Sequence, residues 1–109
     1  MQRYGVLFVH DPVVALDLAE ILTAKLGPMQ LYFPTSATEA ASLLKDAVCV
    51  VTDQLAHTNL EEVISSISIP QLHLGTDQEK PLSAAFARIE EPFTNVSVLN
   101  ALNALGLVT

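Results

Sequence analysis

The sequence predicts a single α/β domain with a parallel sheet covered by helices on both faces. Residues 48–51 form a continuous apolar run that ends at Thr52 and Asp53, as is typical of a strand buried on both faces. Short apolar runs and helical patterns alternate along all 109 residues, about the length of one domain. This alternation indicates five strand–helix units wound on both sides of the sheet.

The expected elements cover the chain without a linker or repeat. Strands are expected over 4–9, 29–33, 47–53, 71–75 and 87–90. Helices are expected over 12–26, 36–45, 58–68, 77–87 and 95–105. The helix over 77–87 has room for only about two to three turns.

Local signals set the helix boundaries. Pro12 suits the first position of the first helix, and Gly27, followed by a proline, ends it. The segments 36–39 (Ser-Ala-Thr-Glu) and 58–61 (Thr-Asn-Leu-Glu) have capping-box spacing and open the second and third helices. Pro70 stops the third helix.

Charge and composition exclude several classes of function. The net charge is −7, from twelve acidic and five scattered basic residues, so neither nucleic acid nor a membrane is an expected partner. There is no secretory signal pattern and no apolar run of about 18 residues. The only cysteine, Cys49, lies in an apolar strand and fits a reducing compartment. We therefore expect a cytoplasmic protein.

From end to end, the chain resembles response-regulator receiver domains. The first strand ends in 9–12 (Val-His-Asp-Pro), where that family has an acidic cluster and often a proline. The third strand ends at Asp53, the place of the family's phosphoacceptor aspartate. Residues 69–70 (Ile-Pro) match the family, and 91–93 (Glu-Pro-Phe) stand where the family has Lys-Pro-Phe. The resemblance implies a flavodoxin-like (βα)5 fold, strand order 2-1-3-4-5 with a shortened fourth helix, and two-component signalling.

The family's metal-holding acids are only partly present. Aligned on Pro12, they fall on Val9 and His10; shifted by one residue, they fall on His10 and Asp11. Asp11 and Asp53 could give Mg²⁺ two carboxylates if Asp11 points inward, with His10 as a weaker ligand. His10 also fits an ordinary polar residue at a strand end. We expect no bound cofactor.

The resemblance also implies a positive side chain beside Asp53, and this is missing. The family lysine falls on Glu91, and the switch hydroxyl falls on Gly75, with Thr76 as the adjacent substitute. Two carboxylates ~4 Å apart repel by about 4 kcal/mol at an effective dielectric constant of 20, or about three orders of magnitude in a rate. We predict that Asp53 is phosphorylated poorly or not at all. A purely structural role for Asp53, capping the loop after the third strand, fits the sequence equally well.

Three hypotheses for function follow. The first is a non-enzymatic, receiver-like interaction module that contacts a protein partner or a second copy through the last helix, Asn95 to Leu105. That helix has an apolar core face (Val98, Leu99, Leu102 and Leu105) and an uncharged opposite side (Ser97, Asn100, Ala101, Asn103 and Ala104), and interface cores are depleted of charge. The second is a working phosphoacceptor switched at Asp53. The third, a small-molecule pocket at the sheet, lacks a glycine-rich phosphate loop.

The remaining candidate residues favour structural roles. We expect His57 in a solvated loop and His73 as a partly buried, hydrogen-bonded strand residue, since three dispersed histidines do not make a zinc site. The sequon 95–97 (Asn-Val-Ser) has no secretory signal to support glycosylation. The resemblance implies a cis bond between residues 91 and 92, which the sequence leaves open.

Overall fold

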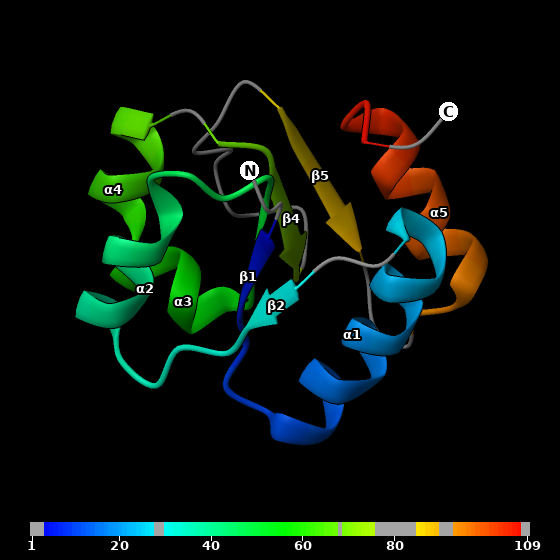
Figure 1. Cartoon of the computed structure of the whole chain (residues 1–109), viewed down its shortest axis with the longest axis horizontal. Coiled ribbons are helices and arrows are strands. Elements are labelled where there is room, and N and C mark those ends of the chain that lie inside the picture. The colour runs from blue at the N-terminus through cyan, green and yellow to red at the C-terminus, as the bar shows by residue number, and fades with distance from the viewer. Residues whose placement is uncertain (1–3, 28–29, 68, 76–84, 90–92, 108–109) are drawn as a thin grey trace.

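Five parallel strands form one sheet in the order β2-β1-β3-β4-β5, which confirms the predicted fold and strand order (Figure 1). The computed structural model describes residues 4–27, 30–67, 69–75, 85–89 and 93–107. The strands are β1 (Tyr4–Phe8), β2 (Gln30–Tyr32), β3 (Val50–Thr52), β4 (Gln71–Leu74) and β5 (Phe86–Ile89). The helices are α1 (Pro12–Leu26), α2 (Ala37–Leu44), α3 (Gln54–Asn59), α4 (Glu61–Ile67) and α5 (Asn95–Ala104).

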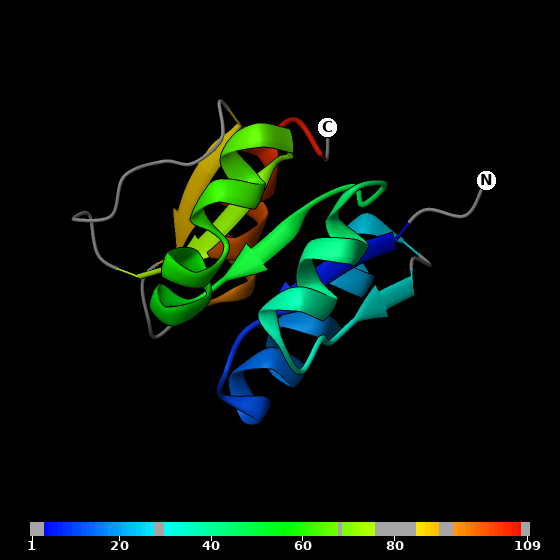
Figure 2. The same cartoon turned by 90° about the vertical axis from the view of Figure 1, so that its left-hand side faces the viewer.

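The sheet separates two helical layers, each with its own apolar core. α2, α3 and α4 cover one face, and α1 and α5 cover the other (Figures 1 and 2). Side chains alternate across the sheet because successive strand residues point to opposite faces. In β1, Leu7 joins the core under α1 and α5, whereas Val6 and Phe8 join the core under α2 to α4.

The helix boundaries at the start of the chain follow their sequence signals. Pro12 opens α1, and Gly27 ends it with a positive φ of 86° while its N–H donates to the Thr23 carbonyl. Ser36 caps α2 by accepting from the Glu39 N–H at 3.1 Å. The Glu39 carboxylate accepts from the N–H of Thr35, so only half of the predicted capping box forms.

The prediction of a single third helix starting at Thr58 is wrong. Two short helices, α3 and α4, occupy this segment. The carboxylate of Asp53 accepts from the Ala56 N–H and caps α3, which begins at Gln54, four residues before the predicted start. Thr58 lies inside α3, and its hydroxyl donates to the Gln54 carbonyl at 3.2 Å. His57 is therefore helical and only 7% exposed, so its expected place in a solvated loop is also wrong.

The last helix is confirmed, with two differences in its buried face. Val98 and Leu102 are buried as predicted, whereas Leu99 is only half-buried. Ala101, expected on the outer side, is 6% exposed and belongs to the core. None of the helices in the described residues is long and apolar enough to cross a membrane. The predicted helix over 77–87 falls mostly outside the described residues.

Candidate functional site

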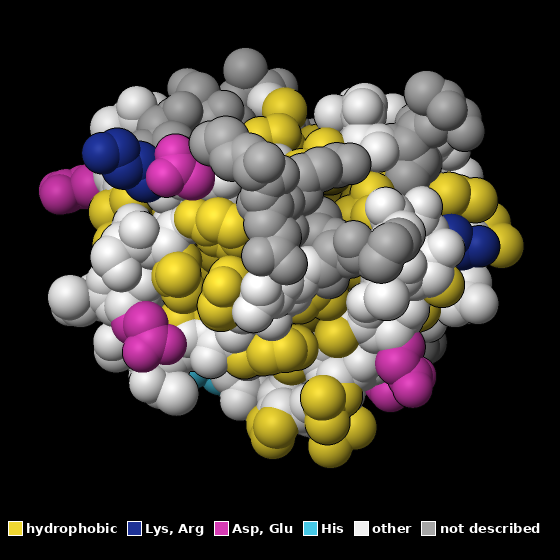
Figure 3. Space-filling view, in the orientation of Figure 1, with side chains coloured by type: hydrophobic (Ala, Val, Ile, Leu, Met, Phe, Trp, Pro, Cys, Tyr) yellow, Lys and Arg dark blue, Asp and Glu magenta, His cyan; other side chains and the backbone are white. Residues whose placement is uncertain are grey.

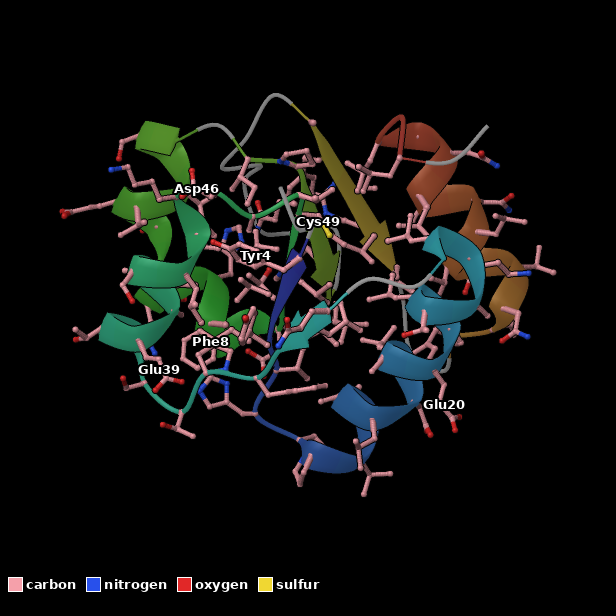
Figure 4. The ribbon with its side chains drawn as sticks, viewed as in Figure 1. Tyr4, Phe8, Glu20, Glu39, Asp46 and Cys49 are labelled. Carbon is pink, nitrogen blue, oxygen red and sulfur yellow. The ribbon has the colours of Figure 1, made fainter. Side chains whose placement is uncertain are left out.

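The site lies where β1 and β3 end side by side. Phe8 at the end of β1 is in register with Thr52 at the end of β3, so the next residues of both strands emerge at the same edge. This edge is the carboxyl end of a parallel sheet, where open α/β folds bind ligands. It places His10 beside Asp53. Phe8 points toward α2 and α3 (Figure 4), and its ring centroid lies 5.0 Å from that of His10.

His10 contacts the Asp53 carboxylate with both its backbone and its side chain. The backbone N–H of His10 donates to Oδ2 of Asp53 at 2.7 Å. Ring atom Nδ1 lies 3.0 Å from Oδ2 and 3.1 Å from Oδ1. On the other side, the Ala56 N–H donates to Oδ1 at 2.8 Å. The carboxylate therefore serves as the N-cap of α3 and as the acceptor for the loop after β1.

These contacts favour the ionised form of Asp53. Partial burial by itself raises the pKa of this carboxyl group. The backbone N–H groups of His10 and Ala56, together with the His10 ring, outweigh that effect and hold the pKa of Asp53 below its ordinary value. The side chain of Asp53 is 23% exposed and that of His10 is 40% exposed, so the pair lies at the surface and is reachable from solvent.

Asp11 has a different role from the one expected for a metal ligand. Its side chain is exposed, and Oδ1 accepts from the N–H groups of Val13 and Val14 at 3.0 and 3.4 Å. It is thus the N-cap of α1, and His10 is the residue that contacts Asp53. Within the part of the chain that the structure describes, no group of three or more His, Cys, Asp or Glu side chains could hold a metal ion.

Two predicted site residues cannot be placed relative to Asp53. Thr76, the substitute for the switch hydroxyl, and Glu91, at the position of the family lysine, both lie outside the described residues. The bond between residues 91 and 92 lies there too.

A buried polar network next to the site was missed in the sequence. Gln71 Nε2 lies 3.0 Å from Thr52 Oγ1 and 2.9 Å from His57 Nδ1. Thr52 Oγ1 in turn lies 3.0 Å from Nδ1 of His73. All four residues are buried, which makes His73 hydrogen-bonded as predicted and more deeply buried than expected. The alternation of polar and apolar residues in 71–74 (Gln-Leu-His-Leu) was the available signal.

This network fastens α3 to the sheet. The amide of Gln71 can donate to two acceptors, so its contact with His57 requires Nδ1 of His57 to be the acceptor. The two imidazole rings of His57 and His73 lie 4.6 Å apart between centroids. Asp53 therefore caps the start of α3, and the contact between His57 and Gln71 joins the last turn of α3 to β4.

Comparison with known proteins identifies the fold. No protein-family model matches the sequence, and no curated protein matches it. A receiver domain protein from Bacillus halodurans superposes with a TM-score of 0.75 and 16% identity, over 96% of this chain and 97% of that chain. A putative response regulator from Chloroflexus aurantiacus superposes with a TM-score of 0.72 and 17% identity, over 97% of this chain and 99% of that chain.

A third similar structure holds a metal ion. It is the receiver domain of a sensor histidine kinase from Pseudomonas aeruginosa with magnesium coordinated in its active-site cleft, at a TM-score of 0.71 and 12% identity, over 97% and 99% of the two chains. Together with the strand order and the two helical layers, these similarities show that the chain has the fold of response-regulator receiver domains.

Proposed function

We propose that this chain is a receiver-fold interaction module in which Asp53 is not used as a phosphoacceptor. The observation that carries the proposal is the contact of His10 with the Asp53 carboxylate through both backbone and ring. Phosphoryl transfer needs a carboxylate oxygen that can attack, and it needs positive groups for the charge that develops. In this site, both carboxylate oxygens already accept hydrogen bonds within the protein.

Phosphorylation of Asp53 would also act against the local fold. A phosphoryl group on either oxygen would displace the N–H of His10 or that of Ala56. Loss of an N-cap costs about 0.5–2 kcal/mol. Glu91, at the place of the family lysine in the sequence, is our predicted source of further repulsion, and Asp11 is taken up in capping α1. These features support a module that works without phosphoryl chemistry and without Mg²⁺.

The contact surface that the sequence favours is the outer side of α5, for a protein partner or a second copy of the chain. The helix has no charged residue between Asn95 and Ala104. Asn100, Asn103 and Val96 are exposed on it. An uncharged helix on a chain with a net charge of −7 supports burial against another protein, since interface cores are depleted of charge.

A mass experiment separates this proposal from its alternative, a phosphoacceptor switched at Asp53. That alternative needs an ionised carboxylate, and the contacts that lower the pKa of Asp53 are consistent with one. The protein is incubated with acetyl phosphate and Mg²⁺, and its intact mass is measured. We expect no stoichiometric gain of a phosphoryl group. A base-labile adduct that forms in the wild type and is absent in Asp53→Asn would reject the proposal.

A further inference from the structure

The contact with Asp53 fixes which nitrogen of the His10 ring carries a proton. Nδ1 lies 3.1 Å from Oδ1 and 3.0 Å from Oδ2 of Asp53, and an ionised carboxylate can only accept hydrogen bonds. Nδ1 must therefore be the donor. In a neutral imidazole, this leaves Nε2 as a hydrogen-bond acceptor. The ring of Phe8, 5.0 Å away between centroids, packs beside the imidazole and helps to hold it in place.

This acceptor is available to a molecule from solvent. Nε2 is on the edge of the ring turned away from Asp53, because Nδ1 occupies the near edge. Within the residues that the structure describes, Nε2 of His10 makes no hydrogen bond. The side chain is 40% exposed. His10 therefore offers one oriented acceptor, whose proton position is set by a neighbour inside the protein.

His10 also lines a hollow of about 390 Å³ between the start of α1 and the segment that follows β2. Ala15 and Pro34 line it and are buried, whereas Leu16 is 63% exposed and Phe33 is 44% exposed at its rim. Figure 3 shows hydrophobic side chains at the lower edge of the molecule, where α1 begins. Small-molecule sites have volumes of about 300–1,000 Å³, mostly apolar walls and a few oriented polar groups. The hollow has this combination.

The charges in and around the hollow favour an uncharged ligand. Among the described residues that line it, there is no Asp, Glu, Lys or Arg. An anion would be repelled by Asp53 next to His10 and by the net charge of −7. A cation would lose hydration without meeting a carboxylate in the wall. The segment after the first strand also lacks the glycine-rich loop that phosphate ligands need.

We propose that this hollow binds a small neutral aromatic molecule of the phenol class, whose O–H donates to Nε2 of His10. The exposed Phe33 ring gives the ligand an aromatic surface, on which a second ring packs offset or edge-to-face. Leu16 covers the ligand from α1. This binding site goes beyond the proposed role as an interaction module. It gives the contact between His10 and Asp53 a use that does not involve phosphoryl transfer.

A matched set of ligands tests the proposal. The probe is 2-naphthol, added to ¹⁵N-labelled protein at about pH 8, where an imidazole is neutral. We expect a Kd of ~0.1–1 mM for a ligand of about eleven non-hydrogen atoms, with shifts of the amides of His10, Leu16, Phe33 and Thr35. The ether 2-methoxynaphthalene keeps the rings and lacks the donor, so it should bind at least about threefold more weakly. The anion 2-naphthoate should not bind.

Three variants assign the contacts. His10→Phe keeps a ring and removes the acceptor, so it should weaken 2-naphthol about threefold to tenfold and leave the ether unchanged. Phe33→Ala removes part of the wall and should weaken both ligands about threefold or more. The matched control is Val96→Ala on α5, at a side chain that is 65% exposed, and it should change neither. In the wild type, the ring ¹⁵N shifts of His10 should show the proton on Nδ1, and 2-naphthol should move the Nε2 resonance.

Several results would overturn the inference: equal binding of 2-naphthol and its ether, full 2-naphthol affinity in His10→Phe, equal loss in Val96→Ala, a proton on Nε2, or amide shifts centred away from the hollow. The titration contains no phosphodonor, so its failure leaves the mass experiment on Asp53 unaffected. Conversely, a phosphoryl adduct on Asp53 together with normal 2-naphthol binding would remove the proposed loss of phosphoryl chemistry and keep the ligand site.

Discussion

At the scale of single residues, Asp53 joins three backbone segments through one carboxylate. It follows β3 directly, caps α3 through the Ala56 N–H, and contacts both the backbone N–H and the ring of His10. A carboxylate with this many donors contributes to stability as well as to the shape of the site. Its removal should therefore be measurable as a change in folding, independently of any function.

We expect Asp53→Ala to lower the free energy of unfolding by about 1–2 kcal/mol, as the loss of an N-cap does. Asp53→Asn should cost less, because asparagine is a good N-cap. The measurement is urea denaturation near neutral pH. Asp46→Ala, at an exposed acid in the turn after α2, is the control and should stay within about 0.5 kcal/mol of the wild type.

The loss of unfolding free energy caused by Asp53→Ala should be smaller at acidic pH. The pKa of Asp53 in the folded protein lies below its reference value of 3.8, so its ionised form stabilises the fold above that pH. The stabilisation is lost as the pH falls through the lower, folded-state pKa. Urea curves of wild type and Asp53→Ala should therefore draw together as the pH falls below 3.8. A constant difference from neutral pH to pH 2 would show that the carboxylate charge contributes nothing.

At the scale of elements, α3 shows why local sequence signals failed. Thr58 and Glu61 have the spacing of a capping box. Asp53, however, already caps α3, so Thr58 lies inside that helix and cannot cap a new one. The competing cap, Asp53 with Ala56, lacks an acidic third residue and gives a weaker sequence pattern. Its advantage comes from the contact with His10 across the sheet edge, which local spacing cannot show.

The network under α3 predicts that Gln71 matters for the stability of that helix. Gln71→Leu removes the amide that contacts both Thr52 and His57. Losing a partner for buried polar groups costs about 1–3 kcal/mol, and we expect faster hydrogen exchange in α3 as well as a lower midpoint in urea. Gln30→Leu, at an exposed glutamine in β2, is the matched control. Unchanged exchange in α3 would contradict the role given to Gln71.

At the scale of the whole molecule, the sequence was informative about architecture and less so about the site. The apolar run 48–51 and the alternation of elements predicted the parallel sheet, because burial on both faces of a parallel strand leaves a direct mark on composition. The location of Asp53 at the carboxyl edge was predicted for the same reason. The strand order was implied by the resemblance to receiver domains. The residue that contacts Asp53 was not predicted, since His10 and Asp11 are adjacent in the sequence and either could face Asp53. The N-terminus of α1 takes Asp11 as its cap, and that leaves His10 for Asp53.

Self-association through α5 is the last expectation that follows from the overall charge. Two copies, each with a net charge of −7, repel one another, and this repulsion weakens as the Debye length falls from about 10 Å at 0.1 M salt to about 3 Å at 1 M. Because α5 itself is uncharged, salt should not weaken the contact directly. We therefore expect the dimer fraction in sedimentation equilibrium to rise with salt.

Variants locate that contact. Asn100→Asp with Asn103→Asp places two charges on the exposed side of α5 and should keep the protein monomeric at every salt concentration, because desolvating unpaired charges in an interface is costly. Ser42→Asp with Ser66→Asp adds the same charge at exposed positions on α2 and α4, and should leave the dimer in high salt. A dimer that the second pair abolishes and the first pair leaves intact would place the contact on the α2–α4 side of the sheet. A wild-type protein that is monomeric throughout would rule out α5 as a self-contact and leave a protein partner as its remaining proposed use.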